Sequence, residues 1–492
     1  MTTDLSHYGI DITPERVIWS PQPKQREFLS RGEYEVLYGG AAGGGKSDAA
    51  IMIPLSQVHI PHFKALILRK TFPQLSELID KSIDYYKRAF PGAKYNTTAH
   101  RWTFPSGATV TFGSMHRRQD RENYRGKQYD VIIFDELTHF TWEEYSFMFS
   151  RNRPSGPGTF VCMRATTNPG GIGHGWVKQR FIDAAPPLTP VIEDVRVPNE
   201  KGELITLKRS RVFVPAKVYD NQALLRNDPM YVANLSMLSE SERKAQLEGS
   251  WDSFSGQVFV EWRNDPEHYR DQRWTHVIEP FRIPSWWRIY RGFDFGFAKP
   301  FSVGWFAVDG DGRMYHIREY YGTSGAPDVG AKLEPHQIAE KIKQIEREDE
   351  NLKGRDIIGI ADPSIFDESR GESIAAMMER PHFVTFGKGD NHRIPGKMQF
   401  HYRLAFDTSG VPMFYVFDTC KHFIRTVPAL VYSESDVEDV DTKQEDHIYD
   451  MTRYVMMENP IASRKNVLAP RIPADDPLDL RERAGKYDFF RV

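Results

Sequence analysis

The stretch YEVLYGGAAGGGKSDAA, Tyr34 to Ala50, decides the fold of the first half of the chain. Its β-prone, apolar start predicts a strand over 34–38, and residues 48–55 predict the opening of a helix. Between them stands the spacing Gly-x-x-x-x-Gly-Lys-Ser of a phosphate-binding loop. Glycines let backbone N–H groups surround phosphate oxygens, and the helix N-terminus adds positive potential. The residues expected to bind a nucleoside triphosphate are Gly40, Gly43, Gly44, Gly45, Lys46 and Ser47, with Lys46 on the β/γ-phosphates and Ser47 on Mg²⁺.

The bulk composition limits the possible classes of protein. A chain of 492 residues is too long for one core, so two or three domains are expected. The formal net charge of -3 provides no overall basic field, so any nucleic-acid site has to be a local patch. The cysteines, Cys162 and Cys420, have apolar neighbours, and we expect buried thiols in a reducing compartment. The absence of a signal sequence and of a long apolar stretch predicts an intracellular protein that does not span a membrane.

A second motif closes the strand predicted over 129–136, YDVIIFDE. Short strands that alternate with helical patterns predict a parallel α/β sheet, whose strand ends lie beside the phosphate loop. We therefore expect Asp135 to hold Mg²⁺ and Glu136 to polarise the attacking water. An Asp-Glu pair alone can simply mark where a strand leaves the core, but behind a complete phosphate loop we favour the functional interpretation.

Two polar residues extend this site. Asn168 follows the strand predicted over 160–167, where it can sense the γ-phosphate, although a plain turn is the alternative. Gln25 stands before a short predicted helix, where its amide can read the adenine edge. A solvated glutamine is equally consistent with the sequence.

The second half of the chain carries a different set of acids. Three β-rich runs (287–297, 301–308 and 314–321), a helix over 335–347 and a strand over 356–361 follow the order of a ribonuclease H-like fold. Asp294 lies inside the first strand, where a carboxylate is costly unless it is paired or bound to metal, and Asp362 follows the fourth strand. Adjacent central strands would bring the two together.

A late predicted helix, 444–454, completes this set. Asp446 and Asp450 are four residues apart and share one face, beside His447. Such a carboxylate cluster suits two divalent ions, Mg²⁺ or Mn²⁺ rather than Zn²⁺, that clamp a phosphodiester. We favour Asp450 over Asp446 as the ligand. A hydrogen-bonded strand aspartate is the alternative for Asp294, and the basic run Lys388–Lys397 is either a phosphate-gripping loop or a plain one.

Several motifs, in order, resemble those of the large terminase subunit of tailed bacteriophages. They are Pro23-Lys24-Gln25, the phosphate loop, Leu68-Arg69-Lys70-Thr71, Tyr124-Arg125-Gly126, Phe134-Asp135-Glu136-Leu137-Thr138, Thr166-Thr167-Asn168-Pro169, Gly292-Phe293-Asp294, Ala361-Asp362-Pro363 and Asp446-His447-x-x-Asp450. The resemblance implies an α/β fold: a P-loop ASCE-type ATPase domain with a parallel sheet, followed by a ribonuclease H-like nuclease domain. It also implies an enzyme that uses ATP to drive double-stranded DNA into a procapsid and cuts it to make genome ends.

The same resemblance implies partners and a further catalytic residue. The expected partners are double-stranded DNA, the portal protein and procapsid, the small terminase subunit and further copies of the chain in a ring, expected to be a pentamer. The expected location is the host cell cytoplasm, outside the mature virion. Arg125, shortly before the acidic strand, is our first choice for a trans-acting arginine finger and Arg69 the second. For both of them, and for Arg117 and Arg118, DNA contact or solvation is the alternative.

The expected domains are 1–250 for the motor, with a β-hairpin at 185–215, 251–285 for a linker, 286–460 for the nuclease and 461–492 for a tail. A helical pattern over 227–251 ends in a glycine cap at Gly249. A helicase or restriction-type translocase with an attached nuclease is the alternative function, but no second set of motor motifs follows. A binding scaffold with a degenerate motor is disfavoured by the intact Lys46, Asp135 and Glu136.

Overall fold

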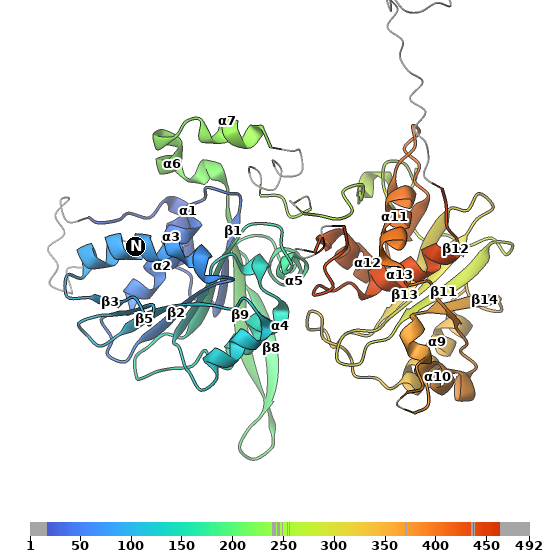
Figure 1. Cartoon of the computed structure of the whole chain (residues 1–492), viewed down its shortest axis with the longest axis horizontal. Coiled ribbons are helices and arrows are strands. Elements are labelled where there is room, and N and C mark those ends of the chain that lie inside the picture. Colours follow the sequence, from blue (N-terminus) through green and yellow to red (C-terminus); the bar gives the residue numbers. More distant parts are fainter. Residues whose placement is uncertain are drawn as a thin grey trace, which may run out of the picture.

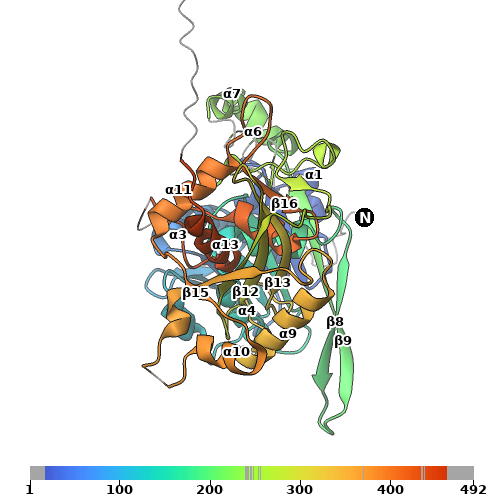
Figure 2. The ribbon, with the colours of Figure 1, turned by 90° about the vertical axis from the view of Figure 1, so that its right-hand side faces the viewer.

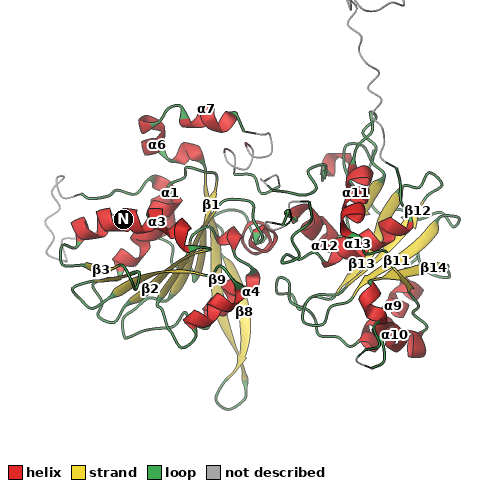
Figure 3. Ribbon diagram, viewed as in Figure 1, coloured by secondary structure: helices red, strands yellow, loops and turns green. Residues whose placement is uncertain are grey.

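The computed structural model describes residues 17–462, apart from 239–242, 244–246, 248, 253, 255, 370, 434, 435 and 437. Two β-sheets organise this part of the chain, one in each of the two lobes of Figure 1. Helices flank both sheets, as Figure 3 shows. No helix among the described residues is long and apolar enough to cross a membrane. The tail predicted at 461–492 falls outside the described residues beyond 462.

The first sheet has the strand order β3-β4-β5-β2-β6-β7-β1-β9-β8. β7 lies between β1, which leads into the phosphate loop, and β6, which leads to Asp135, and all three are parallel. This inserted strand is the hallmark of the ASCE-type arrangement, so the predicted fold of the first half is confirmed. The strands are β1 (Glu35–Gly40), β2 (Lys64–Arg69), β3 (Lys94–Asn96), β4 (Arg101–Thr103), β5 (Thr109–Ser114), β6 (Val131–Phe134), β7 (Cys162–Thr167), β8 (Val191–Pro198) and β9 (Leu204–Ala216).

Helices cover both faces of this sheet, and each face has its own core. Alternate residues of a strand face opposite sides; in β1, Val36 and Tyr38 join one core and Leu37 joins the other. Cys162 is buried as a free thiol, as is Cys420 in the second sheet's domain. The helices are α1 (Pro23–Leu29), α2 (Lys46–Met52), α3 (Phe72–Ala89), α4 (Trp142–Phe149), α5 (His174–Val177), α6 (Gln222–Asn227) and α7 (Tyr231–Ser236).

The predicted β-hairpin is present as β8 and β9, which pair in antiparallel fashion and project from the sheet in both views of Figures 1 and 2. The single helix expected over 227–251 is wrong. α6 ends at Asn227 and α7 begins at Tyr231, because Pro229 lacks an N–H and disfavours the helical conformation of the residue before it. Gly249 has the expected left-handed φ of 70°.

The second sheet has the order β10-β16-β13-β12-β11-β14-β15. β11, β12 and β13 are antiparallel neighbours, and β14 runs parallel to β11, which confirms the ribonuclease H-like prediction. The strands are β10 (Val277–Ile278), β11 (Arg288–Asp294), β12 (Ser302–Val308), β13 (Met314–Tyr321), β14 (Ile357–Ala361), β15 (Gly387–Lys388) and β16 (Phe414–Phe417). The helices are α9 (Pro335–Glu348), α10 (Ile374–His382), α11 (Arg393–Leu404), α12 (Lys421–Thr426) and α13 (His447–Glu458).

The segment 251–285 was expected to be a linker, but much of it packs into the second domain. Val258 and Phe259 are buried in the core of the second sheet's domain. β10 pairs with β16 and so extends the second sheet. Apolar residues in a connecting segment gain more free energy from burial than from solvent exposure, which is why this segment packs.

Candidate functional site

The phosphate loop has the backbone conformation that its glycines permit. Gly40, Gly43 and Gly45 have φ values of 131°, 70° and 70°. Only glycine adopts such angles without a steric penalty. A Cβ on Gly40 would stand 2.8 Å from the carbonyl oxygen of Ala216, and Gly44 would meet the Cβ of Ala216 at 3.0 Å. The loop therefore fits tightly against the end of β9.

Three side chains hold the loop by donating hydrogen bonds to its carbonyl oxygens. The Tyr38 hydroxyl donates to Gly44 at 2.9 Å, Asn221 Nδ2 to Gly43 at 2.6 Å, and Gln25 Nε2 to Gly45 at 2.7 Å. The Gln25 amide oxygen in turn accepts from the N–H of Gln22 at 2.7 Å. Gln25 is 3% exposed, so the solvated alternative is wrong. Its amide braces the phosphate loop and does not stand free for an adenine edge.

Lys46, the first residue of α2, points back into the loop. Its Nζ donates to the carbonyl oxygen of Ala41 at 2.5 Å, and the side chain is buried. Burial lowers the pKa of Lys46, and the nearby carboxylates of Glu136 and Asp135 oppose that shift. Ser47 follows on the same helix turn and is half-buried. The structure thus gathers the loop lysine and both predicted acids in one place.

Asp135 is buried at the end of β6 and has two side-chain partners. Arg69 Nε donates to Asp135 Oδ2 at 2.6 Å, and the Thr166 hydroxyl donates to the other oxygen. Arg69 lies at the end of β2 and Thr166 on β7, the two strands that flank β6. Arg69 therefore neutralises the acid that we expect to hold Mg²⁺.

Glu136 and Asn168 contact each other directly. Glu136 has a left-handed backbone with φ of 58°, which turns its side chain toward the end of β7. Asn168 Nδ2 donates to Glu136 Oε1 at 3.0 Å, and the Asn168 N–H donates to Oε2 at 3.2 Å. Asn168 Oδ1 is buried without a hydrogen-bond partner among the described atoms. The turn after β7 is thus attached to the predicted catalytic acid rather than standing as a plain turn.

The candidate arginines have different surroundings. The side chain of Arg125 is 70% exposed and pairs with Glu122, whereas that of Arg69 is 17% exposed and pairs with Asp135 of its own chain. Arg117 is exposed. The side chain of Arg118 lies outside the described part of the structure.

In the second domain, two predicted acids meet at the ends of parallel strands. β11 pairs with β14 so that Phe293 is opposite Ala361, and Asp294 and Asp362 are the next residues of each. The N–H of Asp362 donates to the carbonyl oxygen of Phe293 at 3.1 Å. The prediction that adjacent strands bring these acids together is confirmed by this register.

α13 brings the other two acids to the same place. It packs on β11 and β12, where a Cβ on Gly292 would lie 2.7 Å from Met451 Sδ. The close approach of this helix to the sheet therefore requires glycine. Asp446 is the N-cap residue of α13, and Asp450 lies in its first turn. His447 lies between them in the chain, with Nδ1 3.4 Å from Asp294 Oδ2 and Nε2 3.3 Å from Asp328 Oδ1.

The electrostatics show that this cluster holds excess negative charge. Burial raises the pKa of Asp294 to about 6, with contributions from Asp450 and Asp362. Burial, followed by the charge of Asp450, raises the pKa of Asp446 to about 8. Burial opposes protonation of His447, but Asp294 and Asp446 outweigh it and raise the pKa of its imidazole.

Cationic and hydroxyl groups surround the remaining acids. Arg453 Nη2 lies 3.0 Å from Asp450 Oδ1, and Arg393 Nη1 lies 3.3 Å from the same oxygen. The Tyr454 hydroxyl donates to Asp362 Oδ2. Burial tends to raise the pKa of Asp362, but its hydrogen bonds, including that from Tyr454, lower it overall.

The donor set of the cluster fits divalent metal ions in its chemistry. Four carboxylates, the type of ligand that Mg²⁺ and Mn²⁺ prefer, lie around the end of β11 and influence one another electrostatically, but no three of their oxygens lie within 4.8 Å of one another. Among the described residues, the only three acid, histidine or cysteine ligand atoms within 4.8 Å of one another belong to a different group, His316, Glu319 and Cys420. The aspartates are instead engaged by His447, Arg393, Arg453 and Tyr454.

We expect the carboxylate cluster of the metal-free protein to stabilise the fold less as the pH rises from about 5 to about 8. The folded-state pKa values of about 6 for Asp294 and about 8 for Asp446 exceed the ordinary value of 3.8, so these two groups hold more protons in the folded chain than in the unfolded one in this window. The raised pKa of His447 acts in the same direction. Differential scanning calorimetry of the Asp446→Asn variant should show a flatter pH dependence, and an unchanged slope would contradict the shift of Asp446.

The loop expected over Lys388–Lys397 is only partly a loop, because α11 begins at Arg393. Lys397 is 7% exposed, and its Nζ donates to the carbonyl oxygen of Glu438. It is therefore a packing residue and is not available for a backbone phosphate. Lys388 is exposed.

Residues 37–263 match a protein-family model described as "Terminase large subunit, T4likevirus-type, N-terminal". This part of the chain is therefore similar to the N-terminal part of the large terminase subunit. The resemblance seen in the motifs is thereby confirmed, and the match covers the phosphate loop, Asp135, Glu136 and Asn168. No curated protein matches the sequence.

Solved structures of phage terminases are also similar to this chain. The large terminase of a thermophilic bacteriophage is 16% identical, with 89% of this chain and 98% of that chain covered and a TM-score of 0.35. The HK97 bacteriophage large terminase is 10% identical, with 89% and 95% covered and a TM-score of 0.42. The P22 large terminase nuclease domain is 17% identical, with 42% and 92% covered and a TM-score of 0.29.

Several residues of the two sites were not predicted from the sequence. Asn221 and Tyr38 hold the phosphate loop, Thr166 contacts Asp135, and Asp328 contacts His447. Asn221 caps the helix α6 far along the chain, and no motif signals its contact with Gly43. Thr166 carried a usable signal, because it is the next-to-last residue of β7, the strand beside β6.

Proposed function

We propose that this chain is a large terminase subunit, a phage genome-packaging enzyme. ATP hydrolysis in its first domain drives double-stranded DNA into a procapsid, and a two-metal nuclease in its second domain cuts the DNA. The observation that carries the proposal is the presence of two separate phosphate-chemistry sites on two separate sheets. The family-model match of residues 37–263 supports the motor part.

In the first site, each residue has a distinct role in the proposal. The loop of Gly40, Gly43, Gly44 and Gly45 cradles the phosphates of ATP, and Lys46 neutralises them. Ser47 and Asp135 hold Mg²⁺, which requires Arg69 to release at least one oxygen of Asp135. Glu136 orients and polarises the attacking water. Asn168 contacts the γ-phosphate and is hydrogen-bonded to Glu136. Loss of the γ-phosphate therefore changes the position of Glu136.

In the second site, Asp294, Asp362 and Asp450 would hold Mg²⁺ or Mn²⁺, with Asp446 beside them. Two such ions stabilise the attacking and leaving oxygens of the phosphodiester. The protein's own groups position the acids: His447 contacts Asp294, Tyr454 contacts Asp362, and Arg393 and Arg453 contact Asp450. The raised pKa values of Asp294 and Asp446 support the proposal that positively charged metal ions bind beside these two carboxylates.

The proposed partners are the portal of the procapsid, the small terminase subunit and further copies of this chain, arranged as a ring of about five on the basis of family resemblance. The proposed place of action is the cytoplasm of the host cell. A packaging assay with purified procapsids, ATP and linear duplex tests the whole proposal. Protection of the duplex from added nuclease supports packaging, whereas strand separation without protection would support the helicase alternative.

If Arg125 acts on the nucleotide of a neighbouring subunit, two inactive variants should complement each other. Arg125→Ala lacks the finger and should lose about 10³-fold or more in hydrolysis rate, and Glu136→Gln lacks the polarising acid. In mixed rings, the Glu136→Gln subunit still offers its Arg125 to the intact site of its Arg125→Ala neighbour. ATPase of the mixture in the packaging complex should therefore recover well above either variant alone.

Arg69→Ala is the matched comparison for this experiment. Arg69 is paired with Asp135 of its own chain, so mixing Arg69→Ala with Glu136→Gln should restore no activity. Recovery with Arg69→Ala and none with Arg125→Ala would reverse the assignment.

A further inference from the structure

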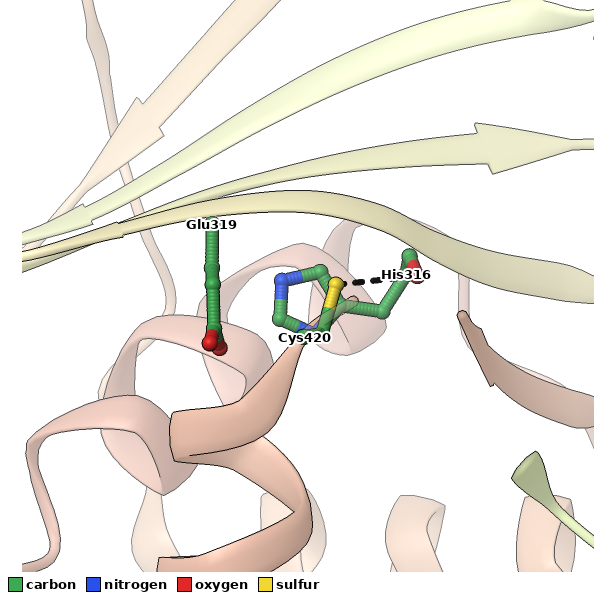
Figure 4. Close-up of side chains that lie close together, drawn as sticks. All are labelled: His316, Glu319 and Cys420. Atoms are coloured by element: carbon green, nitrogen blue, oxygen red, sulfur yellow. Dashed lines mark hydrogen bonds between the residues drawn. The ribbon is translucent and has the colours of Figure 1, made fainter. Parts of the chain in front are cut away.

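A buried group of possible metal ligands lies in the second domain, away from both sites described above. It consists of His316 and Glu319 on β13 and Cys420, which follows β16 (Figure 4). One ligand atom from each residue lies within 4.8 Å of the other two. His316 and Cys420 are fully buried, and Glu319 is half-buried.

A β-bulge directs the two strand residues to the same side of the sheet. Residues three apart in a regular strand face opposite sides. Trp305 on β12 is opposite Arg318 on β13, and the next residue of β12, Phe306, is opposite His316 on β13. Ile317 is therefore an extra residue of β13 without a partner on β12. Glu319 is opposite Gly304, on the face that His316 shares. Bulges are a recognised way to re-aim side chains.

Among the described residues, neither ring nitrogen of His316 has a hydrogen-bond partner of normal geometry, although its side chain is wholly buried and the backbone of Arg318 is near enough to oppose the lowering of its pKa by burial. Its ring stacks on Phe306 with the centroids 4.5 Å apart, and Phe423 packs against it edge-on at 5.3 Å. A buried polar group without a partner costs free energy. A phenylalanine or leucine would suit these apolar surroundings better, unless a nitrogen of His316 has a ligand to bind.

Of the other two residues, Glu319 has the second contacts that metal ligands usually have. The carboxylate of Glu319 accepts from the N–H of His422 at 2.7 Å and from that of Phe423 at 3.0 Å, one bond to each oxygen. Such outer contacts orient a ligating carboxylate. Cys420 Sγ lies 3.5 Å from the carbonyl oxygen of His316, a weak contact for a thiol.

We propose that His316, Glu319 and Cys420 form a structural site for a zinc ion. A thiolate and an imidazole select zinc over Mg²⁺, and a carboxylate is an accepted third ligand. Bonds of about 2.0–2.3 Å in a tetrahedron place donor atoms roughly 3–4 Å apart. The three side chains, whose ligand atoms lie within 4.8 Å of one another, would supply three of the four positions and a water molecule the fourth. The charges of one thiolate and one carboxylate balance those of Zn²⁺, so that the occupied site is neutral inside the core.

The ion would fix β13 to the connection between β16 and α12. This connection lies close to α13, the helix that carries Asp450. A Cβ on Gly304 would meet Met451 Cε at 2.6 Å and His316 Nε2 at 2.9 Å, which places the site next to α13. Zinc binds the thiolate and not the thiol of Cys420, so binding releases a proton and zinc affinity should rise with pH.

The test uses the full chain, expressed without a metal-binding tag in medium with added zinc and then desalted. Metal analysis should find about one zinc ion per chain. Protein grown with cobalt in place of zinc should show a thiolate-to-cobalt charge-transfer band in the near ultraviolet. Full-length, folded wild-type chain with neither zinc nor the cobalt band would overturn the proposal.

Variants locate the ion. Cys420→Ser and His316→Phe should lose the metal, whereas Cys162→Ser, which changes the other buried thiol, should keep it. The phenylalanine of His316→Phe suits the surrounding aromatic rings, so this variant is expected to fold. Loss of zinc from it would then not reflect unfolding. Its ATPase activity is a second check that the preparation is folded. Asp446→Asn should retain the zinc, which separates this site from the nuclease. Zinc retained in both Cys420→Ser and His316→Phe would place the ion elsewhere and overturn the assignment.

Discussion

Replacing Glu136 by glutamine should lower the ATPase rate about 10²- to 10⁴-fold, the usual contribution of a group that polarises the attacking water. Glutamine keeps the shape and can still bond to Asn168, so the geometry around the turn after β7 is preserved. DNA cleavage by the second domain should be unchanged, because its acids belong to another sheet. Phosphate release and duplex cutting measured on the same preparation test both parts.

The control for Glu136→Gln is Glu143→Gln, which removes the same charge from α4. Glu143 pairs with Arg121 at 2.6 Å and its side chain is 43% exposed. Its replacement should leave hydrolysis within about twofold of wild type, because surface pairs contribute little. Wild-type ATPase in Glu136→Gln would remove this acid from the mechanism, and loss of both activities would mean that the two sites are not independent.

Replacing Asp294 by asparagine should lower duplex cleavage at least about a hundredfold, because bound metal contributes several kcal/mol to the transition state. ATPase should remain. The melting temperature of the metal-free protein at neutral pH should stay the same or rise, since burial raises the pKa of Asp294 to about 6 and the variant removes a charge that the fold disfavours. Cleavage, phosphate release and calorimetry together separate catalysis from misfolding.

Asp311→Asn provides the comparison for Asp294→Asn. Asp311 is exposed in the turn between β12 and β13 and its N–H donates to Asp309. We expect normal cutting and normal ATPase in this variant. Cleavage retained by Asp294→Asn with Mg²⁺ or Mn²⁺ would remove Asp294 from the metal site.

The parts of the molecule that short motifs specify were predictable from the sequence. The phosphate loop fixes β1 and α2 because its glycines, lysine and serine permit few other structures. Asp294 and Asp362 were expected to be neighbours because the first lies in, and the second directly follows, a strand of a recognisable order, and the register of β11 and β14 confirms it.

Contacts between distant segments were not predictable in the same way. The use of Gln25 as a brace for Gly45 depends on where α1 packs, which local pattern does not reveal. The burial of Val258 and Phe259 depends on the second core, which a Pro- and Trp-containing segment did not suggest. Arg69 is the partner of Asp135 only because β2 and β6 are adjacent.

The position of α13 in the chain has a consequence for synthesis on the ribosome. β11 and β14 can pair before residue 446 has been made, but Asp446 and Asp450 are still missing at that stage. The proposed nucleotide site, by contrast, has its last loop-bracing residue at Asn221, well before α13. A nascent chain therefore completes the proposed nucleotide site first, and the proposed nuclease site lacks two of its acids until α13 has emerged and docked.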